Sequence, residues 1–223
     1  MFYETATNQH GMRYDPFKAL VVPRPIGWVS TISNDGVVNI APYSFFNAMS
    51  DKPPYVIFSS AGIKDTLANI NQNGEFVCSL ANWDLRYEVN TTSAPVPYGV
   101  DEFELAGLTA AASRLVKPPR VKYAPAAFEC KLWQTFDLPD ERDEKSLRYT
   151  VIIGRVVGIH IEDQYIKDGR VDTGAMRPIA RLGYMDYAVI TPENVFTINR
   201  PEVGADGKVA NARPDGVWDG QYR

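Results

Sequence analysis

The sequence is poor in the residues that most often carry acid–base or metal chemistry. Its 223 residues include two cysteines, Cys78 and Cys130, and two histidines, His10 and His160. Their spacing matches no metal-ligand pattern, so a dedicated zinc site is not expected. Both cysteines lie in apolar, strand-like runs, which favours buried thiols over a disulfide. Either histidine could be catalytic, but a structural or solvated role is favoured for each, and hydrolysis by a triad or a metal has little support.

Nucleotide and nucleophile motifs are also missing. No G-x-G-x-x-G follows a strand, no P-loop is present, and no G-x-S-x-G elbow occurs. A Rossmann dinucleotide site and a P-loop phosphate site are therefore not expected.

Long apolar runs and concentrated charge are absent as well. No stretch approaches about 18 apolar residues, and the polar segment Met1–Tyr14 has no apolar core of a signal peptide. We therefore expect a soluble, cytoplasmic protein that neither spans a membrane nor carries a signal peptide. The formal net charge is -4, and no run of lysine and arginine dominates. Nucleic acid is not an expected partner, although local basic residues could hold a small phosphate.

Most of the remaining segments are rich in β-branched residues or alternate between apolar and polar residues. They predict a mainly antiparallel β fold with a few helices. A β-barrel would remove the exposed edges of such a sheet. Strands are expected over residues 26–32, 37–46, 55–60, 75–80, 128–133 and 148–162, and residues 184–191 end the folded core. Pro42 lies inside the second of these segments, which indicates an edge strand or a bulge.

Helices and segment boundaries follow from turn and capping residues. A helix is expected over residues 64–73, capped by Asp65 or Thr66 and ended by Gly74. Weaker helical patterns cover residues 83–89 and 103–115, with a loop over 91–99 and a charged turn over 140–145. The sequence divides into an N-terminal arm (1–22), a β-barrel domain (23–191) and a C-terminal tail (192–223).

Residues 59–66 form a candidate phosphate site, because they connect a strand to a helix. The start of a helix offers free backbone N–H groups and the positive end of its dipole. Lys64 adds a full positive charge, and Ser60 and Thr66 add hydroxyl donors. The alternative is an ordinary capped helix beside a solvated lysine.

Residues 41–47 form a second candidate. Pro42 removes one backbone donor and favours a bulge, so the N–H groups after it could face a ligand. A planar heterocycle requires such donors at its edge and apolar walls on its faces. The alternative is a plain strand with a buried aromatic cluster.

Five segments in order resemble the signature segments of the flavin reductase-like, FMN-binding split-barrel family. They are residues 24–31, 39–47, 64–70, 74–78 and 181–187, and the likeness runs from about Pro23 to Tyr187. Each segment alone would be weak, but their order makes the resemblance specific.

The resemblance implies a homodimer with FMN near the subunit interface. By position, Trp28, Ser30 and Thr31 would line the flavin, and Ser44, Phe45, Phe46 and Asn47 would meet the edge of its ring. Ser60, Lys64 and Thr66 would hold the phosphate, and Arg181 would reach the cofactor. Asp65 is interpreted as the helix cap and not as a ligand. No metal is implied.

The function implied is an FMN-dependent oxidoreductase that passes a hydride from NADH or NADPH to FMN, and electrons on to free flavin or another acceptor. Flavin carries this chemistry itself, so no acid–base pair is required of the protein. One alternative is an electron-transfer protein that carries FMN without its own nicotinamide site. Another is a β-barrel interaction protein that has lost the cofactor.

Overall fold

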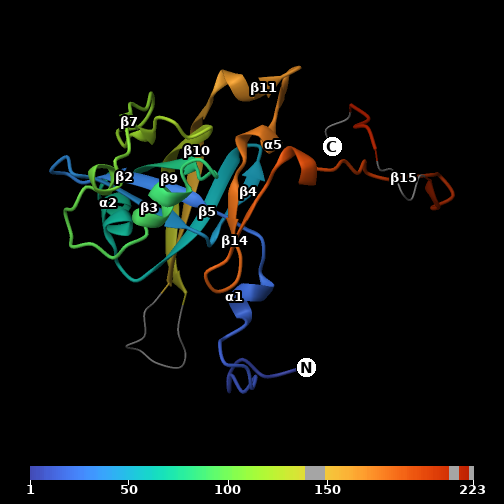
Figure 1. The fold of residues 1–223 in the computed structure, drawn as a ribbon, viewed down its shortest axis with the longest axis horizontal. Coiled ribbons are helices and arrows are strands. Elements are labelled where there is room, and N and C mark those ends of the chain that lie inside the picture. The colour runs from blue at the N-terminus through green and yellow to red at the C-terminus, as the bar shows by residue number, and fades with distance from the viewer. Residues whose placement is uncertain (139–148, 211–215, 221–223) are drawn as a thin grey trace.

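A seven-stranded antiparallel sheet forms the centre of the molecule (Figure 1). The computed structural model describes residues 1–138, 149–210 and 216–220. The strand order is β3-β2-β6-β9-β10-β5-β4. The strands are β2 (Gly27–Ile32), β3 (Val38–Tyr43), β4 (Phe46–Asp51), β5 (Pro54–Ala61), β6 (Glu75–Leu80), β9 (Ala126–Leu138) and β10 (Tyr149–Ile161). The predicted mainly antiparallel β fold is confirmed.

The sheet is rolled, because its two edge strands are consecutive in the chain. Ser44 and Phe45 alone connect the end of β3 to the start of β4, although β3 and β4 are opposite edges of the sheet. The sequence predicts one strand over residues 37–46, and the structure corrects this to two strands with a break at Ser44. Pro42 lies in β3, which agrees with the prediction of an edge strand. The rolled sheet is the expected split barrel.

Short elements surround the sheet. The helices are α1 (Phe17–Leu20), α2 (Asp65–Asn73), α3 (Arg86–Thr91), α4 (Glu102–Leu105) and α5 (Thr173–Met176), with 3-10 turns η1 (Asp163–Tyr165) and η2 (Pro192–Asn194). A second sheet joins β1 (Arg24–Pro25), β13 (Ile179–Arg181) and β14 (Tyr187–Val189). Three small hairpins pair β7 (Ala110–Ala111) with β8 (Arg120–Val121), β11 (Ile166–Lys167) with β12 (Arg170–Val171), and β15 (Glu202–Val203) with β16 (Val209–Ala210).

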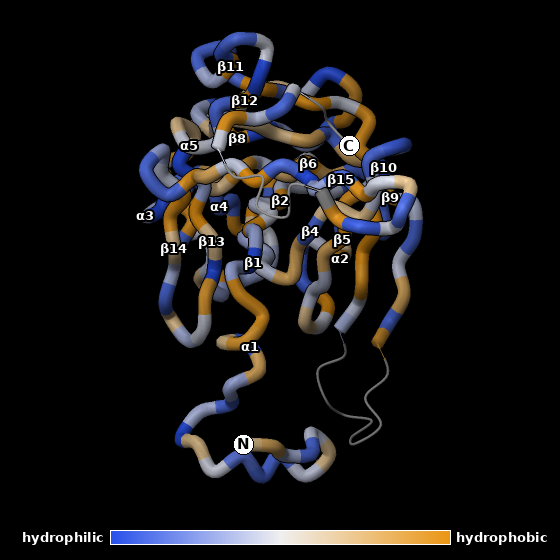
Figure 2. Tube along the Cα trace, turned by 90° about the vertical axis from the view of Figure 1, so that its right-hand side faces the viewer, coloured by the Kyte–Doolittle hydropathy of each residue, from blue (hydrophilic) through white to orange (hydrophobic). Residues whose placement is uncertain are grey.

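The two ends of the chain extend away from the sheet. The N-terminal residues before α1 project from one end of the molecule (Figure 2), and β15 and β16 lie to one side of it (Figure 1). The seven sheet strands lie within the predicted domain of residues 23–191. Among the described residues, no helix has the length and apolar character needed to cross a membrane.

Separate hydrophobic clusters pack against the two faces of β2. Val29 and Trp28 are neighbours in β2, and each is fully buried in a different hydrophobic cluster. Since successive strand residues point to opposite faces, β2 is packed on both sides. The cluster around Val29 includes Ile70 of α2 and Cys78, and both Cys78 and Cys130 are buried free thiols, as predicted.

The sequence-based helices between residues 83 and 115 were placed incorrectly. The first lies at Arg86–Thr91 and not at 83–89, and the second is reduced to the four residues of α4. Gly107 has a φ of 65°, and the N–H of Leu108 donates to the carbonyl of Phe103, so the chain leaves the helix there. The charged turn predicted over 140–145 lies outside the described residues.

Glu129 anchors the long loop between β7 and β8 from inside the sheet. Its carboxylate is fully buried, accepts the N–H groups of Arg114 and Leu115, and lies 2.5 Å from Nε2 of His160. Desolvation is the largest influence and raises the pKa of Glu129, but the hydrogen bond with His160 and the two backbone N–H groups together hold that pKa below 4.5. His160 therefore has the structural role that its sequence context favours.

We expect Glu129→Gln to lower the free energy of unfolding at pH 7 by about 1.5–3 kcal/mol, because hydrogen bonds to a charged acceptor are lost. A depressed pKa stabilises the fold above the pKa of the unfolded state, and this stabilisation is lost as pH falls through the folded-state pKa. The difference between wild type and variant should therefore shrink below about pH 4.5. Urea unfolding at several pH values tests this, with Glu162→Gln as the control for a partly exposed ion pair. An equal difference at pH 3 and pH 7 would contradict it.

Candidate functional site

Two cavities meet at the link between the edge strands. One has a volume of about 450 Å³ and the other about 300 Å³, and Ser44, Phe45 and Ser59 line both. The N–H of Ser59 donates to the carbonyl of Phe45 at 3.1 Å, which fastens the link to β5. Because these residues line both, the two cavities lie next to each other, and together we call them the flank trough.

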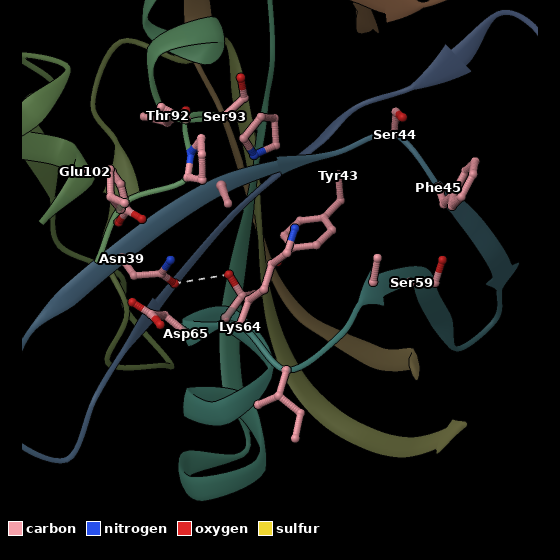
Figure 3. A pocket seen from close by; sticks show the side chains of 18 of the residues that line it. Asn39, Tyr43, Ser44, Phe45, Ser59, Lys64, Asp65, Thr92, Ser93 and Glu102 are labelled. Atoms are coloured by element: carbon pink, nitrogen blue, oxygen red, sulfur yellow. Dashed lines mark hydrogen bonds between the residues drawn. The ribbon is translucent and has the colours of Figure 1, made fainter. Parts of the chain in front are cut away.

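The larger cavity contains the start of α2. Thr66 lines it, as does Lys64 (Figure 3), and the backbone of Lys64 is extended with φ −122° and ψ 169°. No side chain caps this helix. The first N–H groups of a helix have no partner within the helix, so α2 offers donors and a positive dipole end to the cavity. Gly74 ends the helix with φ 68°, as predicted.

The predicted role of Asp65 is wrong. The N-cap position is Lys64, and Asp65 is the first residue inside the helix, where its side chain makes no capping hydrogen bond. Asp65 instead lines the larger cavity. The prediction failed because an acidic residue is common both at the cap and in the first turn, and the sequence does not separate the two.

A buried network of polar side chains holds α2 against β2 and β3. Asn39 accepts hydrogen bonds from Thr31 at 2.6 Å and from Thr66 at 3.2 Å. Asn69 donates to Thr31 at 3.0 Å. Thr31 is fully buried and lines neither cavity, so it positions the start of α2 from behind rather than touching a ligand.

Trp28 and Ser30 were expected to line the site, and the structure corrects this placement for the single chain. Both are fully buried. The indole of Trp28 donates to Thr92 at 2.9 Å, and the hydroxyl of Ser30 donates to the carbonyl of Pro119. Because Thr92 lines the larger cavity, Trp28 supports the wall without forming its surface.

Ser60 and Arg181 also lie outside both cavity walls. Ser60 is buried, and its hydroxyl donates to the carbonyl of Gly62 at 3.2 Å. Its neighbours Ser59 and Ala61 line the larger cavity instead. Arg181 donates to the carbonyl of Tyr184, and its guanidinium lies 4.4 Å from the centre of the Tyr187 ring.

The remaining predicted residues are brought together. Ser44 and Phe45 line both cavities, Phe46 and Asn47 line the smaller one, and Lys64 and Thr66 line the larger one. Gly27 makes the position of Phe46 possible, since a Cβ atom at Gly27 would overlap the Phe46 ring. Both candidate segments of the sequence therefore contribute residues to the walls of the flank trough.

The wall residues that the sequence reasoning missed include Arg24, Tyr43 and Glu102. Arg24 lines the smaller cavity and donates to the carbonyls of Lys18, Val21 and Leu182. Glu102 begins α4 and lines the larger cavity. Tyr43 and Arg24 lie inside the segments that resemble the family, but Glu102 lies just before the longer helix that the sequence predicts over residues 103–115.

Tyr43 has an unpartnered hydroxyl group in the wall. The residue is 7% exposed, and its buried hydroxyl oxygen makes no hydrogen bond. Burial raises the pKa of Tyr43, and the nearby hydroxyls of Thr66 and Ser60 oppose that rise. A buried polar group without a partner is costly, so this hydroxyl is available to a ligand in the larger cavity.

The described part of the chain contains no candidate metal site. Residues 1–138, 149–210 and 216–220 contain no group of three or more His, Cys, Asp or Glu side chains able to hold an ion. The donors in the trough are instead hydroxyls, amides, backbone N–H groups, Lys64 and Arg24, which suit an organic anion with a polar-edged ring.

Known proteins share both the sequence pattern and the fold of this chain. Residues 19–180 match the family described as flavin reductase like domain. An uncharacterized protein of Aquifex aeolicus is 42% identical over 174 residues, which cover 75% of this chain and 85% of that protein. The crystal structure of nitrilotriacetate monooxygenase component B from Bacillus cereus is 33% identical with a TM-score of 0.77, covering 85% of this chain and 95% of that one. The structure of 2-nitrobenzoate 2-nitroreductase from Pseudomonas fluorescens is 26% identical with a TM-score of 0.77, covering 92% and 100%.

We expect Tyr43→Phe to leave the stability of the ligand-free protein unchanged or to raise it, because the variant keeps the ring that packs 4.9 Å from Phe58 and removes only the unpartnered hydroxyl. Thr66→Val provides the contrast, since it removes a buried hydrogen bond to Asn39 and should cost about 1 kcal/mol. Thermal unfolding of both variants measures this. A loss of stability in Tyr43→Phe as large as in Thr66→Val would show that the hydroxyl has a structural partner.

Proposed function

This chain belongs to the flavin reductase-like domain family, and we propose that it is an FMN-dependent oxidoreductase that takes a hydride from NADH or NADPH. The observation that carries the proposal is that the link Ser44–Phe45 and the uncapped start of α2 line the same cavity of the flank trough. The names of the two similar structures denote redox enzymes, which supports the reaction class.

The smaller cavity suits the isoalloxazine ring. Its walls include the apolar side chains of Ile57, Phe58 and Val151, and Ser44 and Asn47 add polar groups. A flat heterocycle with polar edges binds well between apolar faces when a few donors fix its orientation. Phe45, shared by both cavities, would separate the ring from the chain that carries the phosphate.

The larger cavity suits the ribityl phosphate. Lys64 and the free N–H groups at the start of α2 would neutralise the phosphate, and Thr66 adds a hydroxyl. The unpartnered hydroxyl of Tyr43 would gain a hydrogen bond from the bound ligand. These donors fit a phosphate monoester, whereas a neutral ligand would leave the positive end of the helix unused.

The residues of this chain would hold and orient the cofactor. FMN, when bound, supplies the hydride and electron chemistry. Ser44 and Asn47 would fix the edge of the ring, and Lys64 and Thr66 would fix the phosphate, so that one face of the ring is held toward the protein and the other stays open to a nicotinamide. Apolar side chains such as Ile57 and Phe58 would exclude water from the inner face.

A homodimer is part of the proposal. Large apolar side chains are exposed on β4 and β9, including Met49, Trp133 and Phe136, and a second copy of the chain would bury them. Arg181 lies outside the cavities of its own chain, so the role that the family resemblance gives it would be carried out across the subunit interface.

We expect the purified protein to oxidise NADH or NADPH in the presence of FMN, and the bound flavin to lose its yellow colour when the nicotinamide is added without oxygen. The absorbance of flavin and nicotinamide measures both. The control is the same mixture without flavin. Flavin that is reduced by dithionite but by neither nicotinamide would favour the electron-transfer alternative. A protein that binds no flavin at all would contradict the proposal.

Lys64→Ala should weaken FMN binding by about 10- to 150-fold, since a charge-assisted hydrogen bond contributes about 1.5–3 kcal/mol. Riboflavin has no phosphate, so its affinity should change little. Lys52→Ala, in the exposed turn between β4 and β5, is the matched control and should leave both affinities unaltered. Fluorescence titration gives the four dissociation constants. An equal loss of affinity for FMN and riboflavin, or no loss for either, would show that the phosphate does not bind at the start of α2.

A further inference from the structure

The larger cavity extends past the start of α2, where the proposed flavin would leave it unfilled. Figure 3 shows Ser44 and Phe45 on one side of Lys64, and Asp65, Asn39 and Glu102 together on the other. All of these residues line the same cavity. With the ring beside Ser44 and Phe45 and the phosphate beside Lys64, the far end, where Glu102 lies, would receive no part of FMN.

Glu102 is a buried carboxyl group with no structural ion pair. It is 5% exposed, and one carboxylate oxygen, Oε2, accepts the N–H of Ile40 at 3.1 Å. Within the described ranges, no lysine, arginine or histidine lies within salt-bridge distance of it. Asp101 caps α4 by accepting the N–H of Phe103 at 2.8 Å, so the turn that directs Glu102 into the cavity wall is fixed.

Asp65 brings a second negative charge to the same end. Desolvation is the main cause that raises the pKa of Glu102, and the negative charge of Asp65 raises it further. Burial is the main cause that raises the pKa of Tyr43, the hydroxyls of Thr66 and Ser60 oppose the rise, and the charges of Glu102 and Asp65 add a smaller increase. Their field therefore reaches Tyr43, a residue of the same cavity wall.

We propose that Glu102 and Asp65 form an acidic end wall that selects a flavin with a single phosphate and rejects one with a pyrophosphate, such as FAD. This inference rests on the proposed function. Lys64 and the start of α2 provide positive charge for one phosphate group. A second phosphate would lie farther along the cavity, beside two carboxylates and without a cation. Specificity of this kind arises from repulsion of the wrong ligand more than from attraction of the right one.

Glu102→Gln tests the end wall with little change of shape. The Gln side chain keeps an oxygen that can accept the N–H of Ile40, and it removes the charge. Asp65→Asn removes the second charge at a residue whose side chain makes no capping bond. Glu104→Gln is the matched control, because Glu104 lies in the same helix but is exposed and lines neither cavity.

The experiment measures the dissociation constants of FMN, FAD and riboflavin for the wild type and the three variants by fluorescence titration. We expect the wild type to prefer FMN to FAD, and Glu102→Gln to reduce that preference on the order of 10-fold, mainly by tightening FAD. Asp65→Asn should act in the same direction, and Glu104→Gln should have no effect. Thermal unfolding checks that each variant is folded, and Asp65→Asn keeps the test decisive if Glu102→Gln does not fold.

The outcomes separate the two proposals. A wild type that binds no flavin would overturn the proposed function and this inference with it. A wild type that binds FMN, with an unchanged preference in both cavity variants, would overturn the acidic end wall and leave the proposed function standing. Weaker FAD binding by Glu102→Gln would also overturn it, since the carboxylate would then be accepting hydrogen bonds from the sugar hydroxyls of the longer ligand.

Discussion

The two-residue link Ser44–Phe45 constrains the whole molecule. It joins the end of β3 to the start of β4, and these strands are the opposite edges of a seven-stranded sheet. Consecutive Cα atoms are 3.8 Å apart, so the Cα atoms of Tyr43 and Phe46 lie within about 11 Å of each other. The sheet can meet this condition only by rolling until its edges approach. The hydrogen bond from Ser59 to Phe45 then holds the closure in place.

The same closure creates the candidate site. An exposed sheet edge presents unpaired backbone groups to solvent. Here the two edges border the flank trough instead. The start of α2 enters this trough because Asn39 of β3 accepts hydrogen bonds from both Thr31 and Thr66. A positive helix end is thereby fixed between an apolar cavity on one side and two carboxylates on the other. Under the proposed function, this charge distribution would provide a place for one ring and one phosphate.

The sequence predicted those features that depend on local chemistry. The strand pattern and the helix ending at Gly74 follow from residue type and order, and the structure agrees with them. The grouping of Ser44, Phe45, Lys64 and Thr66 was implied by the family resemblance, and the structure places these four residues in the wall of one cavity. What sequence reasoning missed depends on distant contacts. Trp28 looks like a ligand-facing aromatic until Thr92, 64 residues away, is seen to accept its indole N–H.

Glu102 illustrates the same limit. Its burial results from the packing of α4 against β3, which no periodicity in residues 103–115 reveals. Gly107 is the one local signal that the helix is short, because its positive φ ends the turn. The positions of Tyr43, Asp65 and Glu102 depend on the rolled sheet as a whole. Their places in the site could therefore not be assigned from sequence alone.

A crystal structure of the protein grown with FMN tests the central claim most directly, namely that the flank trough is a flavin mononucleotide site. The account predicts phosphate oxygens within hydrogen-bond distance of Lys64 Nζ and the backbone N–H groups at the start of α2, with the edge of the ring at Ser44–Asn47. Flavin bound elsewhere, for example in the apolar hollow beside Trp83 and Tyr87, or bound with its phosphate away from α2, would contradict it.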